Sequence, residues 1–184
     1  FFSFLIFSCE STETESTETV KVVEPAKKQK KQLTEEEKLN LFLEEFYTKL
    51  SNALNSGSID DALALYDEIP EQYANNYDLA YIKASLLISK QDYAFAKEIA
   101  NQLLELNPDN TEILMLLSVI AKGTGDKAGK TAILQQILAK EPYHAGANTE
   151  LGHEQMLKAN YKLANRYYLT ALAGESTNLD ALAG

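Results

Sequence analysis

The sequence is poor in residues that build disulfides and metal centres, with one cysteine and two histidines among 184 residues. Cys9 has no second cysteine to pair with, so no disulfide can form within the chain. His144 lies near a predicted turn and has no partner histidine or cysteine close in sequence. His153 and Glu154 begin like a zinc-protease helix, but the second histidine is missing because position 157 is Leu157. These absences exclude a disulfide scaffold and argue against a metal site.

Basic residues are also scarce, with 17 Lys and Arg against 27 Asp and Glu and a net charge of −10. Such a surface repels phosphate backbones, so a nucleic-acid partner is not expected. No stretch is long and apolar enough to span a bilayer. No Ser/His/Asp arrangement can be picked out, and the carboxylates are spread as on solvated faces. The composition therefore predicts no enzyme, no catalytic residues and no cofactor.

The first 33 residues differ from the rest of the chain. Residues 1–8 are apolar or small and end at Cys9, after which a Ser/Thr/Glu tract follows. Residues 5–9 (Leu-Ile-Phe-Ser-Cys) resemble the signal of bacterial lipoproteins, although Phe7 is bulky where that family usually has Ala or Ser. The resemblance implies a remnant of a signal-peptide h-region (1–8), a lipidated Cys9 and a flexible tether (9–33).

This resemblance also implies a lipid-anchored location in the bacterial cell envelope, facing the periplasm or the cell exterior. The membrane contact would then be made through the lipid. The alternative interpretation is a short apolar N-terminus with an incidental cysteine.

A 34-residue period runs through the remainder of the chain. Ser58, Asp92, Asp126 and Asn160 share one frame without insertion or deletion, and all four are helix N-cap types. An N-cap side chain accepts a hydrogen bond from an unpaired N–H group of the first helical turn. The spacing therefore predicts four helices that start at a fixed interval, as in stacked helical-hairpin repeats.

Helical spacing of apolar residues begins after Thr34, which fits a capping box with Glu37. The chain can then be divided into 34-residue units that begin at Leu43, Tyr77, Thr111 and Ala145, with an incomplete fifth unit from residue 179. We expect each unit to hold one helix, a short turn just before the capping residue, and a second helix.

The fourth unit resembles the tetratricopeptide repeat family most specifically. Leu151 and Gly152 match the Leu-Gly pair of that family's first helix, while Ala164, Tyr168 and Ala171 match the small, aromatic and small positions of the second. Small residues at helix crossings let the backbones approach. Other units repeat parts of this pattern at Ala62, Tyr66, Ala84, Ala96, Pro108 and Pro142. The resemblance covers residues 34–184 and implies an all-α, right-handed superhelical solenoid of stacked antiparallel helix hairpins.

Four positions depart from the family pattern. Leu50 replaces the small residue of the first helix, which indicates that unit one is an atypical terminal unit. Pro70 is expected to end the second helix of that unit early. Asn148 stands where an aromatic residue is usual. Lys130 occupies the small position of unit three, so we expect that hairpin to splay slightly or the Lys stem to run out to solvent.

In this family the first helix of each unit lines the inner, concave face. The resemblance therefore implies a groove for a protein partner, a peptide or a helix, lined by Tyr47, Ser51, Leu54, Tyr81, Ser85, Ile88, Met115, Val119, Thr149, His153 and Met156. Tyrosine and methionine suit an adaptable, partly apolar groove. The alternative for any one of these residues is packing against a neighbouring unit or a missing C-terminal helix.

One subtype of the family is not expected. Repeats that clamp the C-terminal carboxylate of chaperones use Lys, Asn and Arg on this face. The corresponding positions in this chain hold Tyr47, Ser51, Ile82, Glu112 and Leu116.

Residues 123–131 (Gly-Thr-Gly-Asp-Lys-Ala-Gly-Lys-Thr) echo a phosphate-binding loop. That motif would require Gly at position 124, where Thr124 stands, and the repeat frame makes the segment a helix end, a turn and an N-cap. The sequence as a whole predicts a membrane-anchored, non-catalytic scaffold for protein–protein interaction. The alternatives are a soluble cytoplasmic adaptor of the same fold and a nucleotide-binding enzyme that uses residues 123–131.

Overall fold

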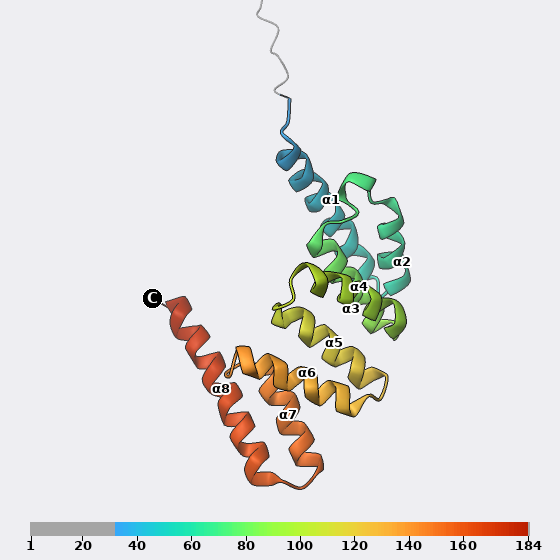
Figure 1. Cartoon of the computed structure of the whole chain (residues 1–184). Helices are drawn as coiled ribbons and strands as arrows, with labels where there is room; N and C mark the ends of the chain where they lie inside the picture. The colour runs from blue at the N-terminus through green and yellow to red at the C-terminus, as the bar shows by residue number, and fades with distance from the viewer. Residues whose placement is uncertain (1–31, 184) are drawn as a thin grey trace, which may run out of the picture. The chain divides into compact units, whose positions relative to one another are not determined.

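The structure, a computed structural model, describes the backbone of residues 32–183 and the side chains of residues 32–174. Within that range every regular element is helical, as the predicted all-α class requires (Figure 1). None of these helices combines the length and the apolar character needed to cross a membrane. The predictions about residues 1–8, Cys9 and the tether up to residue 31 lie outside the described residues.

The helices of the repeat domain follow one another with short connections. In chain order they are α1 (Glu35–Asn55), α2 (Ile59–Ala64), the 3-10 helices η1 (Leu65–Glu68) and η2 (Glu71–Tyr73), α3 (Tyr77–Ser89), α4 (Tyr93–Leu106), α5 (Thr111–Gly123), α6 (Lys127–Lys140), α7 (Ala145–Leu157) and α8 (Tyr161–Ala183). The capping box predicted at the start of α1 is present, because Thr34 Oγ1 accepts from the Glu37 N–H while the Glu37 carboxylate accepts from the Thr34 N–H.

Consecutive helices pair into hairpins, and the hairpins stack. α1 packs against α2, α3 against α4, α5 against α6, and α7 against α8. Neighbouring hairpins meet through α2 and α3, α4 and α5, and α6 and α7, and α3 also contacts α5. The domain is therefore a right-handed superhelical solenoid of antiparallel helix hairpins of the tetratricopeptide type (Figure 1).

The second helices of the four hairpins begin one period apart, as the capping residues predict. Their first residues are Ile59, Tyr93, Lys127 and Tyr161. The side chains of Ser58 and Asp126 accept hydrogen bonds from backbone N–H groups of the first turn, at 3.1 and 2.8 Å. The Asp92 side chain makes no such bond, and Asn160 donates its amide to a glutamine side chain of α7. The four helices thus start where predicted, but the prediction of a side-chain cap hydrogen bond is wrong for Asp92.

In the turn of every hairpin, the residue directly before the N-cap of the second helix has a left-handed backbone conformation. The φ angle is +81° at Gly57, +65° at Gln91, +79° at Gly125 and +57° at Ala159. In each turn the N–H of the following capping residue donates to a carbonyl five residues earlier, which closes the first helix in a Schellman-type motif. The 34-residue period is therefore the repeat of a junction that ends one helix and starts the next.

Three buried clusters hold the stack together, and each draws on successive helices. Phe46 and Tyr66 belong to the cluster shared by α1, α2, η1 and α3. Ile113 belongs to the cluster of α3, α4 and α5, and Leu134 and Leu151 belong to that of α5, α6 and α7. Because every cluster lies between neighbouring hairpins, apolar burial stabilises the array rather than any single hairpin.

Small residues occupy the helix crossings of units one, two and four, whereas a lysine occupies the equivalent crossing of unit three. Ala62, Ala96 and Ala164 are fully buried. At the equivalent place in unit three, Lys130 is itself only 8% exposed, so the expectation that its stem runs out to solvent is wrong. Its Nζ atom turns toward α7, where it lies 2.7 Å from Glu150 Oε2. The ion pair compensates for the burial of the ammonium group.

Unit one has the irregular shape that Leu50 and Pro70 predict. α2 contains six residues and continues as η1 and η2, which lie on either side of Pro70. Leu50 is buried in the same cluster as Tyr66, and the Tyr66 ring meets the Phe46 ring edge-on at a centroid distance of 5.1 Å. Large side chains of α1 and η1 therefore pack together in the unit whose second helix is short.

The last helix differs from the expectation of an incomplete fifth unit. A new helix from residue 179 would require a break, whereas α8 is continuous from Tyr161 to Ala183. Pro108 and Pro142 precede α5 and α7, because proline cannot continue a helix. The equivalent position at the fourth boundary is Ser176, which imposes no such break.

Candidate partner-binding face

The first helices of the hairpins carry three sets of equivalent positions, which we call rows one, two and three. Row one is Tyr47, Tyr81, Met115 and Thr149; row two is Ser51, Ser85, Val119 and His153; row three is Leu54, Ile88, Lys122 and Met156. Within each helix the three positions follow the i, i+4, i+7 spacing of a single helix face. All the predicted partner-binding residues lie on α1, α3, α5 and α7.

Row three contains a residue that the sequence prediction missed. Lys122 stands one period after Ile88 and one before Met156, near the end of α5. The repeat frame alone was sufficient to find it, because the same spacing that selected Leu54 and Ile88 reaches position 122. Row three is therefore apolar in units one, two and four and cationic in unit three.

Row one forms the base of the face. Its four side chains are all half-buried. Tyr47 packs against the cluster shared by α1, η1 and α3, Tyr81 against that of α3, α4 and α5, and Met115 against that of α5, α6 and α7. These residues support the stack as well as lining the face.

Rows two and three are more open to solvent. Leu54, Val119 and Met156 are 42%, 40% and 45% exposed. Ser85 and Ile88 are half-buried, and the remaining members of both rows are exposed. Exposed apolar side chains repeated on one face of several units form the kind of surface that marks a protein contact.

Carboxylates lie beside the row-one tyrosines. Burial raises the pKa of Tyr47, and the nearby charge of Asp78 raises it further. Burial likewise raises the pKa of Tyr81, with Glu112 as the second cause. Both phenols therefore keep their proton at neutral pH and can donate a hydrogen bond. Asp78 and Glu112 stand one period apart at the starts of α3 and α5, so this edge of the face is acidic.

An ionic cluster joins units three and four next to row three. Glu150 accepts from Lys130 at 2.7 Å and from Lys122 at 3.0 Å. Glu154 lies 3.3 Å from Lys130 Nζ and accepts from the Thr131 hydroxyl at 3.0 Å. Burial by itself would raise the pKa of Glu150, but its bonds to the two lysines outweigh burial and lower it. The cluster is therefore charged at neutral pH.

Residues 123–131 form the turn between α5 and α6 and the start of α6. Gly125 has the left-handed φ of the helix-ending motif, and the Gly129 N–H donates to Asp126 Oδ1 at 2.8 Å. Lys130, which a phosphate loop would direct at a nucleotide, is engaged with Glu150 and Glu154. The turn interpretation of this segment accounts for each of these positions.

The histidines have structural contacts. His144 caps α7, where its Nδ1 accepts from the Ala147 N–H at 3.1 Å. The His153 ring meets the Tyr168 ring edge-on at a centroid distance of 5.6 Å. Asn148, at the usual aromatic position, is buried and donates to the carbonyls of Pro142 and His144. Across residues 32–174, no three His, Cys, Asp or Glu side chains come together in a way that could hold a metal ion.

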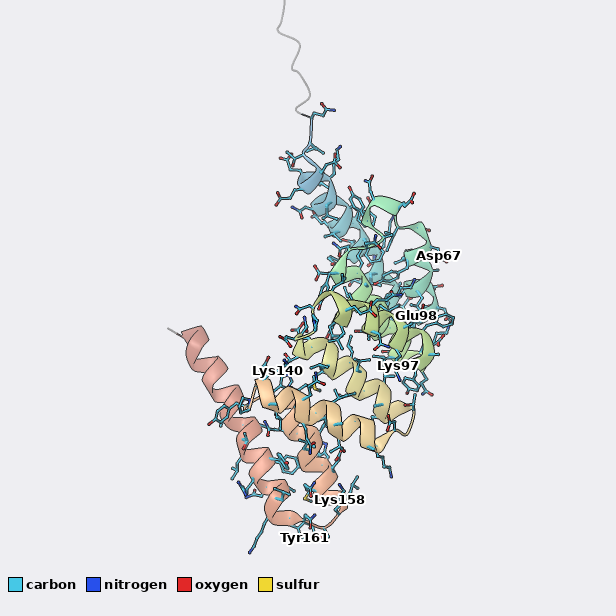
Figure 2. All side chains as sticks on the ribbon, viewed as in Figure 1. Asp67, Lys97, Glu98, Lys140, Lys158 and Tyr161 are labelled. Carbon is cyan, nitrogen blue, oxygen red and sulfur yellow. The ribbon has the colours of Figure 1, made fainter. Side chains whose placement is uncertain are left out.

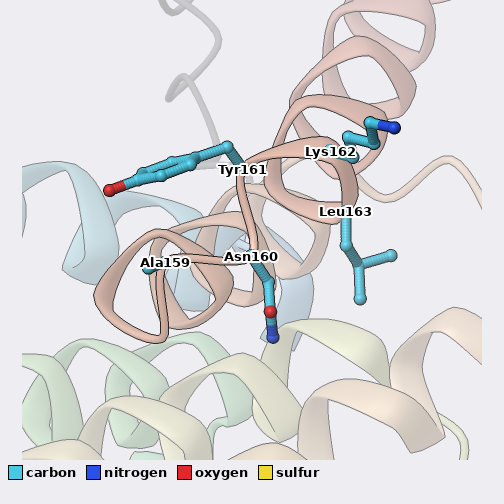
Figure 3. Close-up of a pocket in the computed structure, with 5 residues that line it drawn as sticks. All are labelled: Ala159, Asn160, Tyr161, Lys162 and Leu163. Atoms are coloured by element: carbon cyan, nitrogen blue, oxygen red, sulfur yellow. The ribbon is translucent and has the colours of Figure 1, made fainter.

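A hollow of about 520 Å³ lies at the turn between α7 and α8 (Figure 3). Its lining consists of the consecutive residues 159–163. The side chains of Tyr161 and Lys162 point in different directions in Figure 3. Because no side chain from another element converges on it, this hollow has no arrangement of groups that would recognise a ligand.

Comparison with known proteins supports the repeat assignment for part of the chain. Residues 53–120 match the family described as "Tetratricopeptide repeat". One segment is 29% identical over 118 residues to coatomer subunit epsilon of Caenorhabditis elegans, covering 60% of this chain and 40% of that protein. Another alignment is 28% identical over 115 residues to the DnaJ homolog subfamily C member 7 homolog of Schizosaccharomyces pombe, covering 56% and 24%. The chain thus spans less than half the length of these relatives.

Solved structures of MamA share the fold. MamA 41-end from Desulfovibrio magneticus RS-1 superposes with a TM-score of 0.58 at 18% identity, over 73% of this chain and 76% of that one. A second crystal structure of MamA gives a TM-score of 0.58 at 15% identity, over 75% and 81%. At such identities the likeness concerns the fold alone. The shared fold is a stack of helix hairpins.

Proposed function

We propose that the chain is a non-catalytic scaffold that binds a peptide or helix of a partner protein across rows one to three, and that it has no nucleic-acid partner. The observation that carries the proposal is the presence of exposed apolar side chains on the same face of three first helices, namely Leu54 and Met156 in row three and Val119 in row two. An amphipathic partner segment can place successive apolar residues on such a series. Row-one phenols below it offer hydrogen-bond donors.

The groove is best tested with its exposed residues. Tyr81 and Met115 also pack against the core, so their truncation to alanine would mix lost binding with lost stability. Val119→Ser and Met156→Ser change exposed groups, and Leu106→Ser on α4 is the matched control because Leu106 is 75% exposed outside the rows.

The measurement is quantitative capture of partner proteins by the full chain, with each variant compared with the unsubstituted protein. We expect the groove variants to recover at least about fivefold less of the captured partner while the control is unchanged. Unfolding midpoints should stay the same for all three variants. Equal capture by groove and control variants would show that the partner binds elsewhere.

The proposal includes attachment to a bacterial envelope membrane through acylated Cys9. Its support is the residue pattern around Cys9, an apolar stretch before it and a polar Ser/Thr/Glu tract after it. Metabolic labelling with a fatty acid should mark the unsubstituted chain and not Cys9→Ser. An unlabelled unsubstituted chain would instead favour the soluble cytoplasmic adaptor.

A scaffold role without chemistry also predicts no nucleotide binding. The segment 123–131 is engaged in a turn, a cap and an ion pair. Calorimetric titration of the full chain with ATP should give no heat of binding, and Lys130→Ala should change nothing in that titration. Saturable binding lost in Lys130→Ala would revive the nucleotide-binding alternative.

A further inference from the structure

A cavity of about 420 Å³ opens between the turn after α5, the first turns of α6 and the end of α7. Its charged lining residues are Lys122, Lys127, Lys130, Lys158 and Glu154. Four ammonium groups and one carboxylate thus surround the cavity of a chain whose net charge is −10. The volume falls within the roughly 300–1,000 Å³ typical of ligand pockets.

Two of these lysines have their charge compensated within the protein. Lys130 lies between Glu150 and Glu154, and Lys122 pairs with Glu150. These contacts fix the inner wall of the cavity, because Lys130 and the two glutamates are largely buried. The wall is therefore a preformed part of the junction between units three and four.

The other two lysines stand at the mouth of the cavity with their charge uncompensated. Within the described part of the chain, neither Lys127 nor Lys158 forms an ion pair, and both are exposed. Figure 2 shows Lys158 at the turn between α7 and α8. Two ammonium groups without an ion-pair partner that line one cavity of an otherwise acidic protein create a local positive potential that attracts anionic groups.

An apolar side chain lines the same cavity. Leu157 precedes Lys158 at the end of α7 and is 90% exposed. The aliphatic stems of the surrounding lysines extend this apolar surface. A ligand that fits all of these groups needs a negative charge and an apolar group side by side.

We propose that this cavity binds a Glu or Asp side chain of an acidic partner peptide, with an adjoining apolar residue of that peptide resting on Leu157. Lys127 and Lys158 donate to the carboxylate, and the ion pairs behind them hold the wall in place. The proposal rests on the peptide-binding role argued above and names one chemical feature of the partner. A peptide carboxylate fits better than a free anion, because a free anion would leave Leu157 without a contact.

The test is an NMR titration of the ¹⁵N-labelled full chain with defined probes. The probe is an acetylated and amidated peptide, Ala-Leu-Glu-Glu-Leu-Ala, and its matched control replaces both Glu residues by Gln. We expect the acidic peptide to shift the amide signals of Gly125, Lys127, Leu157 and Lys158, and the Gln peptide to leave them in place. Raising the salt concentration should weaken the binding.

Variants then assign the effect to the lysines at the mouth. Lys127→Gln with Lys158→Gln should weaken binding of the acidic peptide about three- to tenfold. Lys97→Gln with Lys162→Gln removes the same charge from two exposed lysines that do not line the cavity and should leave the affinity unchanged.

Several outcomes would overturn the proposal. These are the absence of shifts at millimolar acidic peptide, equal shifts with the Gln peptide, and equal loss of affinity in the control variant. Inorganic phosphate that shifts these signals where the acidic peptide does not would make the cavity a free-anion site. Such results would leave the groove proposal standing, since Val119→Ser and Met156→Ser test it through separate residues.

Discussion

Lys130 Nζ on α6 lies 2.7 Å from Glu150 Oε2 on α7, so a charge pair joins the third unit to the fourth inside the stack. The other three units have alanine at the position of Lys130. An ammonium group there requires its carboxylate partner, because an unpaired charge in such a place costs far more than the pair itself contributes.

Replacing the buried cation should therefore destabilise the domain. We expect Lys130→Met to lower the free energy of unfolding by about 2 kcal/mol, less than for a fully buried pair because Glu150 keeps some solvent contact. Lys90→Met is the control, since Lys90 forms an equally short but exposed pair with Asp60 and should cost less than about 1 kcal/mol. Urea denaturation measures both, and equal losses would show that burial of the Lys130 pair has no energetic consequence.

Acid should weaken the same junction. The native pKa of Glu150 lies below its ordinary value of 4.5, since the bonds to Lys130 and Lys122 outweigh the effect of burial. Between the two pKa values the unfolded chain binds more protons, so stability is lost as pH falls from 4.5 through the native pKa. Unfolding free energies measured across this window should fall less steeply in Glu150→Gln. An unchanged slope would mean that Glu150 does not titrate differently on folding.

The left-handed turn residues predict two stabilising substitutions. Gln91 and Ala159 adopt positive φ angles with a side chain present, whereas the equivalent positions in the other two hairpins are Gly57 and Gly125. Glycine avoids the Cβ clash but loses more entropy on folding, so Gln91→Gly and Ala159→Gly should each add about 0.5–1 kcal/mol. Thermal unfolding gives the measurement.

The control for these substitutions places glycine inside a helix. Ala132 is exposed in the middle of α6, so Ala132→Gly should instead cost about 1 kcal/mol. Destabilisation by glycine at positions 91 and 159 as well would contradict the left-handed geometry of those turns.

Asp126 and Asp92 occupy equivalent N-cap positions, but they should contribute differently to the free energy of unfolding. Asp126 accepts a hydrogen bond from the Gly129 N–H, so Asp126→Ala should cost about 1 kcal/mol. The Asp92 side chain makes no cap bond, so Asp92→Ala should cost only a few tenths of that amount. Chemical denaturation of the two variants side by side decides the matter, and equal losses would refute the difference between the caps.

The repeat frame was predictable from sequence because its cause is local. Residues that end one helix and cap the next lie within a few positions of one another, so Ser58 and Asp126 mark their junctions without any tertiary information. The same frame gave the helices that carry rows one to three. It also reaches Lys122, which lies one period after Ile88 and one period before Met156.

Other features depend on packing between units and could not be predicted from the sequence. The pairing of Lys130 with Glu150 and Glu154 requires α7 to lie against α6 at one particular height, which no local pattern specifies. The continuity of α8 past position 176 was not predicted for a related reason. A period indicates where a break is expected, but without a proline at position 176 the helix is free to continue.

The short second helix of unit one makes this end of the array easier to open than the interior of the stack. Repeat arrays open in local units rather than all at once, and elements with few helical hydrogen bonds open most easily. The amides of α2 and η1 should then exchange with solvent before those of α5, which lies inside the stack. The chain has no tryptophan, and the Phe46 and Tyr66 rings meet in this same unit. Fraying of one end would therefore change the near-ultraviolet signal of the tyrosines while most of the helical signal persists.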